Sequence, residues 1–235
     1  MALTTQNSNP IIVPCGHKPV RPPRYSITAF DLENGAWDQL DPVPDYPDGL
    51  PLFCHLASCD GELVALGGWD PATYEPVADV FAYDFAAWGG VAMPQRASFF
   101  AVGAHGGRVY VAGGHNKGKN ALRSAWLYDV GRGEWTELPP MSHGRDKCEG
   151  RSFWVVSGCT TSGPGEWRRA ERVWPLERCP SSRVGAGRDG RLFDWAGSDL
   201  AVRAETCRGQ NKKLERINVP NKFSEFAQTG CRVEV

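Results

Sequence analysis

Gly113, Gly118 and Lys119 come close to the phosphate-binding pattern G-x-x-x-x-G-K, and they follow an apolar run. In that pattern the glycine-rich backbone and the lysine hold phosphates, a Ser or Thr after the lysine binds Mg²⁺, and a helix begins there. Asn120 stands where the hydroxyl is needed, and residues 121–128 have the pattern of a strand. We therefore predict a turn at this position and no nucleotide site.

Histidine and cysteine are the other residue types that could bind a cofactor. The five histidines, at positions 17, 55, 105, 115 and 143, are scattered, and the eight cysteines include no Cys-x-x-Cys pair. Structural zinc sites usually need such close ligand spacing. Buried free thiols explain the cysteines better. We expect no metal ion, no cofactor and no catalytic residue.

Glycine pairs at the ends of apolar runs indicate a repeated unit built from strands. Gly67 and Gly68 follow the run 63–66, and Gly113 and Gly114 follow the run 109–112, 46 residues later. An aromatic residue followed by Asp, and then a tryptophan, recurs between the pairs. A unit of about 45 residues with several short apolar runs and no helical period is typical of a four-stranded propeller blade.

The recurring aromatic residues have an expected structural role. They are Tyr83 with Trp88, Tyr128 with Trp135, and Trp37 in the first unit. We expect them to pack between adjacent blades, with Trp135 buried there. The glycines are expected to end a strand near the crowded centre, where a residue without a Cβ lets neighbouring backbone approach.

These positions resemble the kelch repeat, a double glycine followed by a tyrosine and, six residues further, a tryptophan. Residues 48–54, 66–73 and 113–125 are similar to the plant F-box/kelch-repeat proteins, and the resemblance covers roughly residues 24–203. It implies a propeller that captures a protein for a cullin-type ubiquitin ligase. Several members of the group act on phenylpropanoid enzymes or on hormone-response regulators.

The expected fold class is all-β, an incomplete kelch propeller of about four to five four-stranded blades. Residues 1–23 lack the helical pattern of an F-box, so we expect an irregular segment there, and binding to the Skp adaptor only in relatives that carry an F-box. Residues 204–235 have no kelch pattern and are expected to form an irregular tail. The expected blades lie near 24–45 (partial), 46–95, 96–143, 144–182 (shortened) and 183–203 (partial).

A recurring arginine is the first candidate for partner binding. Arg96, Arg145 and Arg183 each lie in a segment that we expect to be a loop entering a blade. In related propellers such loops line the mouth of the central channel, and a guanidinium can hold a carboxylate or stack on an aromatic ring. The alternative is that each arginine pairs with an aspartate of its own blade, and the sequence leaves both open. The aspartates concerned are Asp84, Asp129 and Asp146.

The loops after the glycine pairs form the second candidate surface. Trp69 follows one pair, and His115 and Arg123 follow the next. Aromatic residues are enriched at interaction hot spots, although Trp69 could instead cap the next blade. We expect these three residues and the recurring arginines to converge on one face that binds an acidic or aromatic segment of a partner protein.

The composition limits the other partners. The net charge of −1 and the lack of a basic stripe argue against a nucleic-acid surface. No apolar run approaches the ~20 residues that cross a bilayer, and the first residues do not have the pattern of a signal peptide. We expect a cytoplasmic or nuclear, non-enzymatic binding module. The alternatives are a kelch scaffold unconnected to ubiquitin and a metal-dependent kelch enzyme, which the fold alone does not exclude.

Overall fold

The computed structural model describes backbone in 2–7, 24–31, 34–146, 150–151, 155–156, 159–161, 167–168, 182–184, 191–196, 199–204, 215–221 and 227–233. Side chains are described in 24–31, 34–146 and 217–221, and at Cys231 and Val233. By contacts the chain divides into two compact units. Unit 1 is Met1–Leu52 with Arg178–Val235, and unit 2 is Phe53–Glu177.

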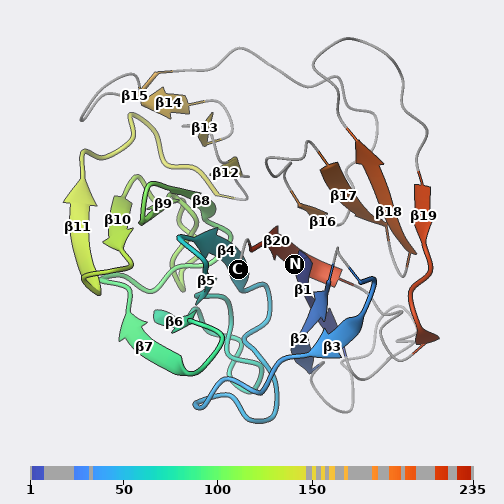
Figure 1. The fold of residues 1–235 in the computed structure, drawn as a ribbon. Helices are drawn as coiled ribbons and strands as arrows, with labels where there is room; N and C mark the ends of the chain where they lie inside the picture. Colours follow the sequence, from blue (N-terminus) through green and yellow to red (C-terminus); the bar gives the residue numbers. More distant parts are fainter. Residues whose placement is uncertain are drawn as a thin grey trace, which may run out of the picture. The chain divides into compact units, whose positions relative to one another are not determined.

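Unit 2 contains three four-stranded antiparallel sheets whose strands follow chain order (Figure 1). The first consists of β4 (His55–Cys59), β5 (Glu62–Leu66), β6 (Asp79–Tyr83) and β7 (Trp88–Ala92). The second consists of β8 (Ala101–His105), β9 (Arg108–Ala112), β10 (Ala125–Asp129) and β11 (Glu134–Leu138). The third has shorter strands, β12 (Gly150–Arg151), β13 (Val155–Val156), β14 (Cys159–Thr161) and β15 (Trp167–Arg168).

Unit 1 contains two more four-stranded antiparallel sheets. One follows chain order: β16 (Ser182–Val184), β17 (Arg191–Ala196), β18 (Asp199–Ala204) and β19 (Glu215–Ile217). The other joins strands from both ends of the sequence, in the order β20 (Ala227–Arg232), β1 (Ala2–Asn7), β2 (Tyr25–Phe30) and β3 (Trp37–Gln39).

The all-β fold class, built from four-stranded blades of the kelch type, is confirmed. The structure differs from the expectation in the two terminal segments, because β1 lies within 1–23, and β19 and β20 lie within 204–235. Backbone pairing joins β1 to β2, β20 to β1 and β19 to β18, and such pairing needs no kelch side-chain pattern. The exact blade boundaries stay a prediction. Among the described residues, no helix has the length and apolar character needed to cross a membrane.

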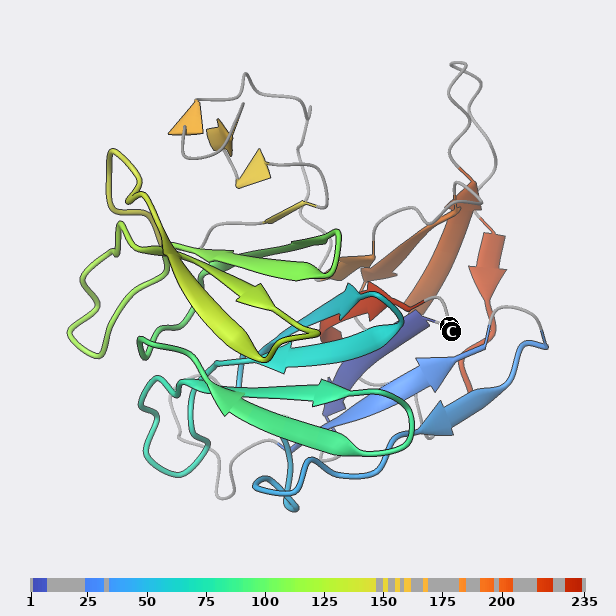
Figure 2. The ribbon, with the colours of Figure 1, turned by 60° about the vertical axis from the view of Figure 1, so that its left-hand side comes forward.

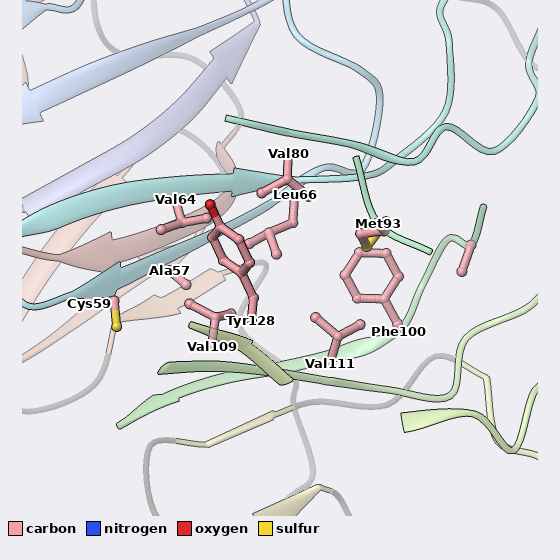
Figure 3. Close-up of a cluster of buried hydrophobic side chains, with 11 residues drawn as sticks. Ala57, Cys59, Val64, Leu66, Val80, Met93, Phe100, Val109, Val111 and Tyr128 are labelled. Atoms are coloured by element: carbon pink, nitrogen blue, oxygen red, sulfur yellow. The ribbon is translucent and has the colours of Figure 1, made fainter. Parts of the chain in front are cut away.

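A buried hydrophobic cluster joins the first two sheets of unit 2, which Figure 2 shows side by side. Leu66 and Val80 come from the first sheet, and Val109 and Val111 come from the second. Phe100, which is fully buried, lies next to Met93 in this cluster (Figure 3). Such a shared core holds the loops of the two sheets in a fixed relation.

The repeated aromatic pairs lie opposite each other within a sheet. Tyr83 stacks on Trp88 with ring centroids 4.6 Å apart, and Tyr128 stacks on Trp135 at 4.9 Å. Tyr128 is also buried in the cluster between the sheets (Figure 3). Trp135, however, is only partly buried, which corrects the expectation of a fully buried tryptophan. It lies on an outer strand, where one face of the indole ring covers Tyr128.

The first glycine of each pair permits a close approach between neighbouring segments. Gly67 has φ of 53°, and a Cβ there would lie 2.8 Å from the ring of Phe100. Gly113 has φ of 71°, and a Cβ there would lie 2.5 Å from the carbonyl oxygen of Arg145. Both the left-handed backbone and the missing space favour glycine at these positions.

Candidate functional site

The antiparallel order places the long loops of the first two sheets at one end. Each sheet has a short turn between its first two strands and another between its last two, so the remaining connections lie at the opposite end. We call that end the loop face, and define it by the loops 67–78, 93–100, 113–124 and 139–146. Side-chain contacts that join loops of the two sheets include the hydrogen bond that Ser124 Oγ donates to Gln95 Oε1 at 2.7 Å and the ion pair of Lys117 with Glu75.

An aromatic cluster lies at the loop face, where the two sheets meet. The rings of Phe53 and Phe99 are 4.9 Å apart, and the ring of Trp69 meets each of them edge-on at 5.9 and 5.7 Å. The His115 ring stacks on Phe99 at 5.3 Å and lies 6.2 Å from Trp69. The structure therefore brings together Trp69 and His115, which follow successive glycine pairs in the sequence.

Two of these aromatic residues have an unusual backbone. Phe53 and Phe99 have φ of 59° and 55°, each two residues before the first strand of its sheet. A bulky side chain in the left-handed region costs energy and is retained where the surroundings impose it. The side chain of Phe53 is exposed, so the cluster presents apolar surface outward.

The two histidines of this region differ in their surroundings. His115 is buried, and its Nδ1 lies 3.8 Å from Oδ2 of Asp146. His55 packs against Phe100 with ring centroids 4.7 Å apart, and burial lowers the pKa of its imidazole to about 4. His55 is therefore neutral at physiological pH and contributes no charge to the surface.

The loop after the first glycine pair presents Tyr74 to solvent. The carboxylate of Asp70 accepts hydrogen bonds from the backbone N–H groups of Ala72 and Thr73 at 2.8 and 2.7 Å. The N–H of Tyr74 donates to the carbonyl of Asp70 at 2.8 Å. These hydrogen bonds hold Tyr74 at φ of 58° with 46% of its surface exposed. The loop thus displays an aromatic side chain on an ordered backbone.

The loop after the second glycine pair is a tight hairpin. His115 pairs with Ala121, and the Asn116 side chain accepts a hydrogen bond from the N–H of Asn120 at 3.1 Å. Lys119 lies at the turn with φ of 58° and is exposed. The strand β10 follows, so the glycine and lysine residues belong to a turn rather than to a helix that would bind phosphate.

Three of the candidate arginines lie on the loop face. Arg96 is exposed in the loop 93–100, next to Gln95, which bonds Ser124. The Nε of Arg123 donates to the carbonyl of Met141 at 2.7 Å. The backbone of Arg145 pairs with Leu122, which places it beside Arg123 in space. Arg123 therefore has a structural contact as well as an exposed position.

The aspartates that the sequence suggests as partners of the recurring arginines have other contacts, as Asp146 has with His115. Asp129 lies 3.7 Å from Arg108, on the neighbouring strand. Asp84 accepts backbone hydrogen bonds from Ala86 and Ala87. No described ion pair involves Arg96 or Arg145.

Arg183 does not occupy the predicted position. It lies within β16, opposite Asp194 of β17, because 182–184 pairs with that strand instead of forming a loop. Its side chain is outside the described residues, and β16 belongs to unit 1. Of the three recurring arginines, Arg96 and Arg145 have described side chains, and the convergence of all three on one face stays a prediction.

Sequence analysis missed Phe53 and Phe99 as members of the cluster. A signal was present, because the two phenylalanines are separated by the same 46 residues as the glycine pairs. Trp69, in turn, is partly buried and meets the ring of Phe53 edge-on. Within the described residues no group of three or more His, Cys, Asp or Glu side chains is placed to hold a metal ion.

Comparisons with known proteins agree with this geometry. Residues 96–142, which contain the second sheet, match the kelch motif. F-box/kelch-repeat protein SKIP20 of Arabidopsis thaliana is 37% identical over 70% of this chain and 46% of its own length. Two further F-box/kelch-repeat proteins of that plant are 41% and 30% identical, over 65% and 90% of this chain and 46% and 58% of their own lengths.

The chain spans about half the length of the curated relatives that it matches. The matches agree with the repeated glycine pairs and with the stacked aromatic pairs of the first two sheets. Over its kelch portion, the chain is similar to the plant F-box/kelch-repeat proteins.

Proposed function

We propose that the loop face captures a target protein, and that the chain serves as the substrate-recognition part of a ubiquitin ligase. The observation that carries the proposal is the exposed aromatic surface of this face, which consists of Phe53 in the aromatic cluster and Tyr74 on its hydrogen-bonded loop. Exposed aromatic side chains on a rigid backbone bind with little loss of conformational entropy. Arg96 and Lys119 on the same face favour a target segment that carries carboxylates beside an apolar residue.

Capture of a target is tested by quantitative affinity purification with matched variants. Tyr74→Ala and the double variant Arg96→Ala/Arg145→Ala should lose the proteins that the parent chain recovers. Tyr74→Phe keeps the ring, and Arg132→Ala removes an exposed arginine from the turn between β10 and β11, so both should retain them. Melting temperatures close to that of the parent would show that the fold is intact. Equal recovery by all variants would exclude the loop face.

The ubiquitin role rests on the relatives and has its own test. The target should accumulate when the gene that encodes this chain is deleted. The accumulation should match that seen on proteasome inhibition. The 235-residue chain itself has no F-box pattern, so we expect it not to bind a purified Skp adaptor and to compete with full-length relatives for the target. A captured protein whose half-life does not change would favour a scaffold role.

Phenylpropanoid enzymes and hormone-response regulators are the target classes that we propose to examine first, in the cytoplasm and the nucleus. The family resemblance suggests these classes, and the acidic and apolar segment defined above gives a criterion for choosing among them. A peptide from a recovered enzyme should bind the parent chain and lose affinity for Arg96→Ala/Arg145→Ala. A peptide that binds both equally would identify a different surface.

A further inference from the structure

The outer strand β7 lacks the charged residues that the other outer strands carry. Its sequence is Trp88-Gly89-Gly90-Val91-Ala92. The corresponding fourth strands of the other sheets each contain at least one charge, at Asp38 in β3, Glu134 and Glu137 in β11, Arg168 in β15, and Glu215 and Arg216 in β19. Charged side chains on an edge strand discourage pairing with another chain, and β7 has no such protection.

The flanking hydrogen bonds show which backbone groups of β7 point outward. Met93 N donates to Ala78 O at 2.6 Å, and Asp84 N donates to Ala87 O at 3.4 Å. In an antiparallel strand these groups alternate between the two sides. The N–H and C=O groups of Trp88, Gly90 and Ala92 therefore point away from β6. Gly90 and Ala92 are exposed, so their backbone groups are accessible.

We propose that β7 is a self-association edge, which pairs antiparallel with β7 of a second copy of this chain around a two-fold axis at Gly90. This pairing places Trp88 opposite Ala92, Gly89 opposite Val91 and Gly90 opposite itself, so that each of the larger side chains faces a small residue. The strand itself brings no charged side chain into the pair. The two outward-pointing groups of each Gly90 bond those of the other copy. The surface is independent of the loop face.

The size of the strand sets the expected strength. A five-residue strand buries far less than the ~1,200 Å² of a standard stable interface. The association is therefore weak and reversible, and sedimentation velocity of the full chain from micromolar to millimolar concentration should show a rising average mass. A chain that stays monomeric over the whole range would overturn the proposal. Pairing of β7 with a strand of another protein would not rescue it.

Substitutions at Gly90 separate backbone pairing from other contacts. Gly90→Pro removes an outward N–H and leaves the bonds to β6, a position where edge strands tolerate proline. Gly90→Ala keeps the N–H, and its Cβ would lie 3.6 Å from the ring of Phe81, which is an ordinary contact. We expect association for the alanine variant and none for the proline variant at the same melting temperature. Equal association of both would contradict a β7 pairing.

A charge-pair experiment tests the two-fold axis and does not depend on proline. Because the axis places residue 90 opposite itself, Gly90→Lys alone and Gly90→Glu alone should each associate about two- to fivefold more weakly than the parent. An equimolar mixture of the two variants should recover association, because opposite charges then face each other. A mixture no stronger than the separate variants would rule out this register.

Discussion

Trp135 is half-buried on an outer strand and stacks on buried Tyr128, so its truncation should cost less than the loss of a full core aromatic. We expect Trp135→Ala to lower the free energy of unfolding by about 1 to 3 kcal/mol, below the ~3 to 5 kcal/mol of a fully buried ring. Urea denaturation monitored by circular dichroism measures this change. Trp135→Phe should recover most of the loss, and an unchanged midpoint for Trp135→Ala would refute the stacking role.

Gly113 combines a left-handed backbone with a close contact, and Gly133 supplies the matched control. Gly133 has φ of 68° with nothing within 4 Å of the Cβ position. Gly133→Ala should therefore cost only the ~1 to 2 kcal/mol of the backbone conformation. Gly113→Ala adds a clash with the backbone of Arg145, and should cost at least about 2 kcal/mol more in the same denaturation assay. Equal costs would show that the contact relaxes freely.

Single residues show where sequence reasoning succeeds at this scale. The glycine pairs could be predicted because positive φ and crowding leave few other residues possible. The left-handed Phe53 and Phe99 could not, since no propensity favours an aromatic residue there. The surrounding packing, and not the local sequence, determines their conformation.

The loop 70–74 depends on an ionised carboxylate. The N–H groups of Thr73, first, and Ala72 hold the pKa of Asp70 below its usual range. A carboxyl whose pKa is lowered in the folded state stabilises the loop above its ordinary pKa of ~3.9, and this contribution disappears as the pH falls through the folded-state value. The amide resonances of Ala72 and Thr73 should shift in that acid range in NMR titrations. Asp70→Asn, which does not titrate, should show no such shift.

Strand pairing was predicted well where it is local and poorly where it is not. The hairpins of β4–β7 and β8–β11 lie within segments marked by glycine and aromatic repeats. β1 and β20 carry no such marks, and they pair across nearly the whole sequence, with Thr4 opposite Gly230. A period of about 45 residues cannot reveal that partnership.

The reactivity of buried thiols can be used to follow the unfolding of each unit. Burial raises the pKa of Cys54, in unit 2, and of Cys231, in unit 1, to about 12. Thiolate is the reactive form, so neither cysteine should react with a thiol reagent at pH 8 in the native protein. Peptide mass spectrometry after labelling in rising urea should show each site react as its own unit opens. Rapid labelling of Cys54 without denaturant would contradict its burial.

The sheet that joins β20 to β1 has a consequence for how the chain is made. The ribosome makes residues 2–7 long before it makes their partner at 227–232. Hairpins such as β8–β9 can form as soon as they emerge, whereas β1 must wait with one edge open. During translation that edge is available to chaperones or to neighbouring nascent chains. A stall before β20 would therefore release a product that is folded in its middle and unpaired at its first strand.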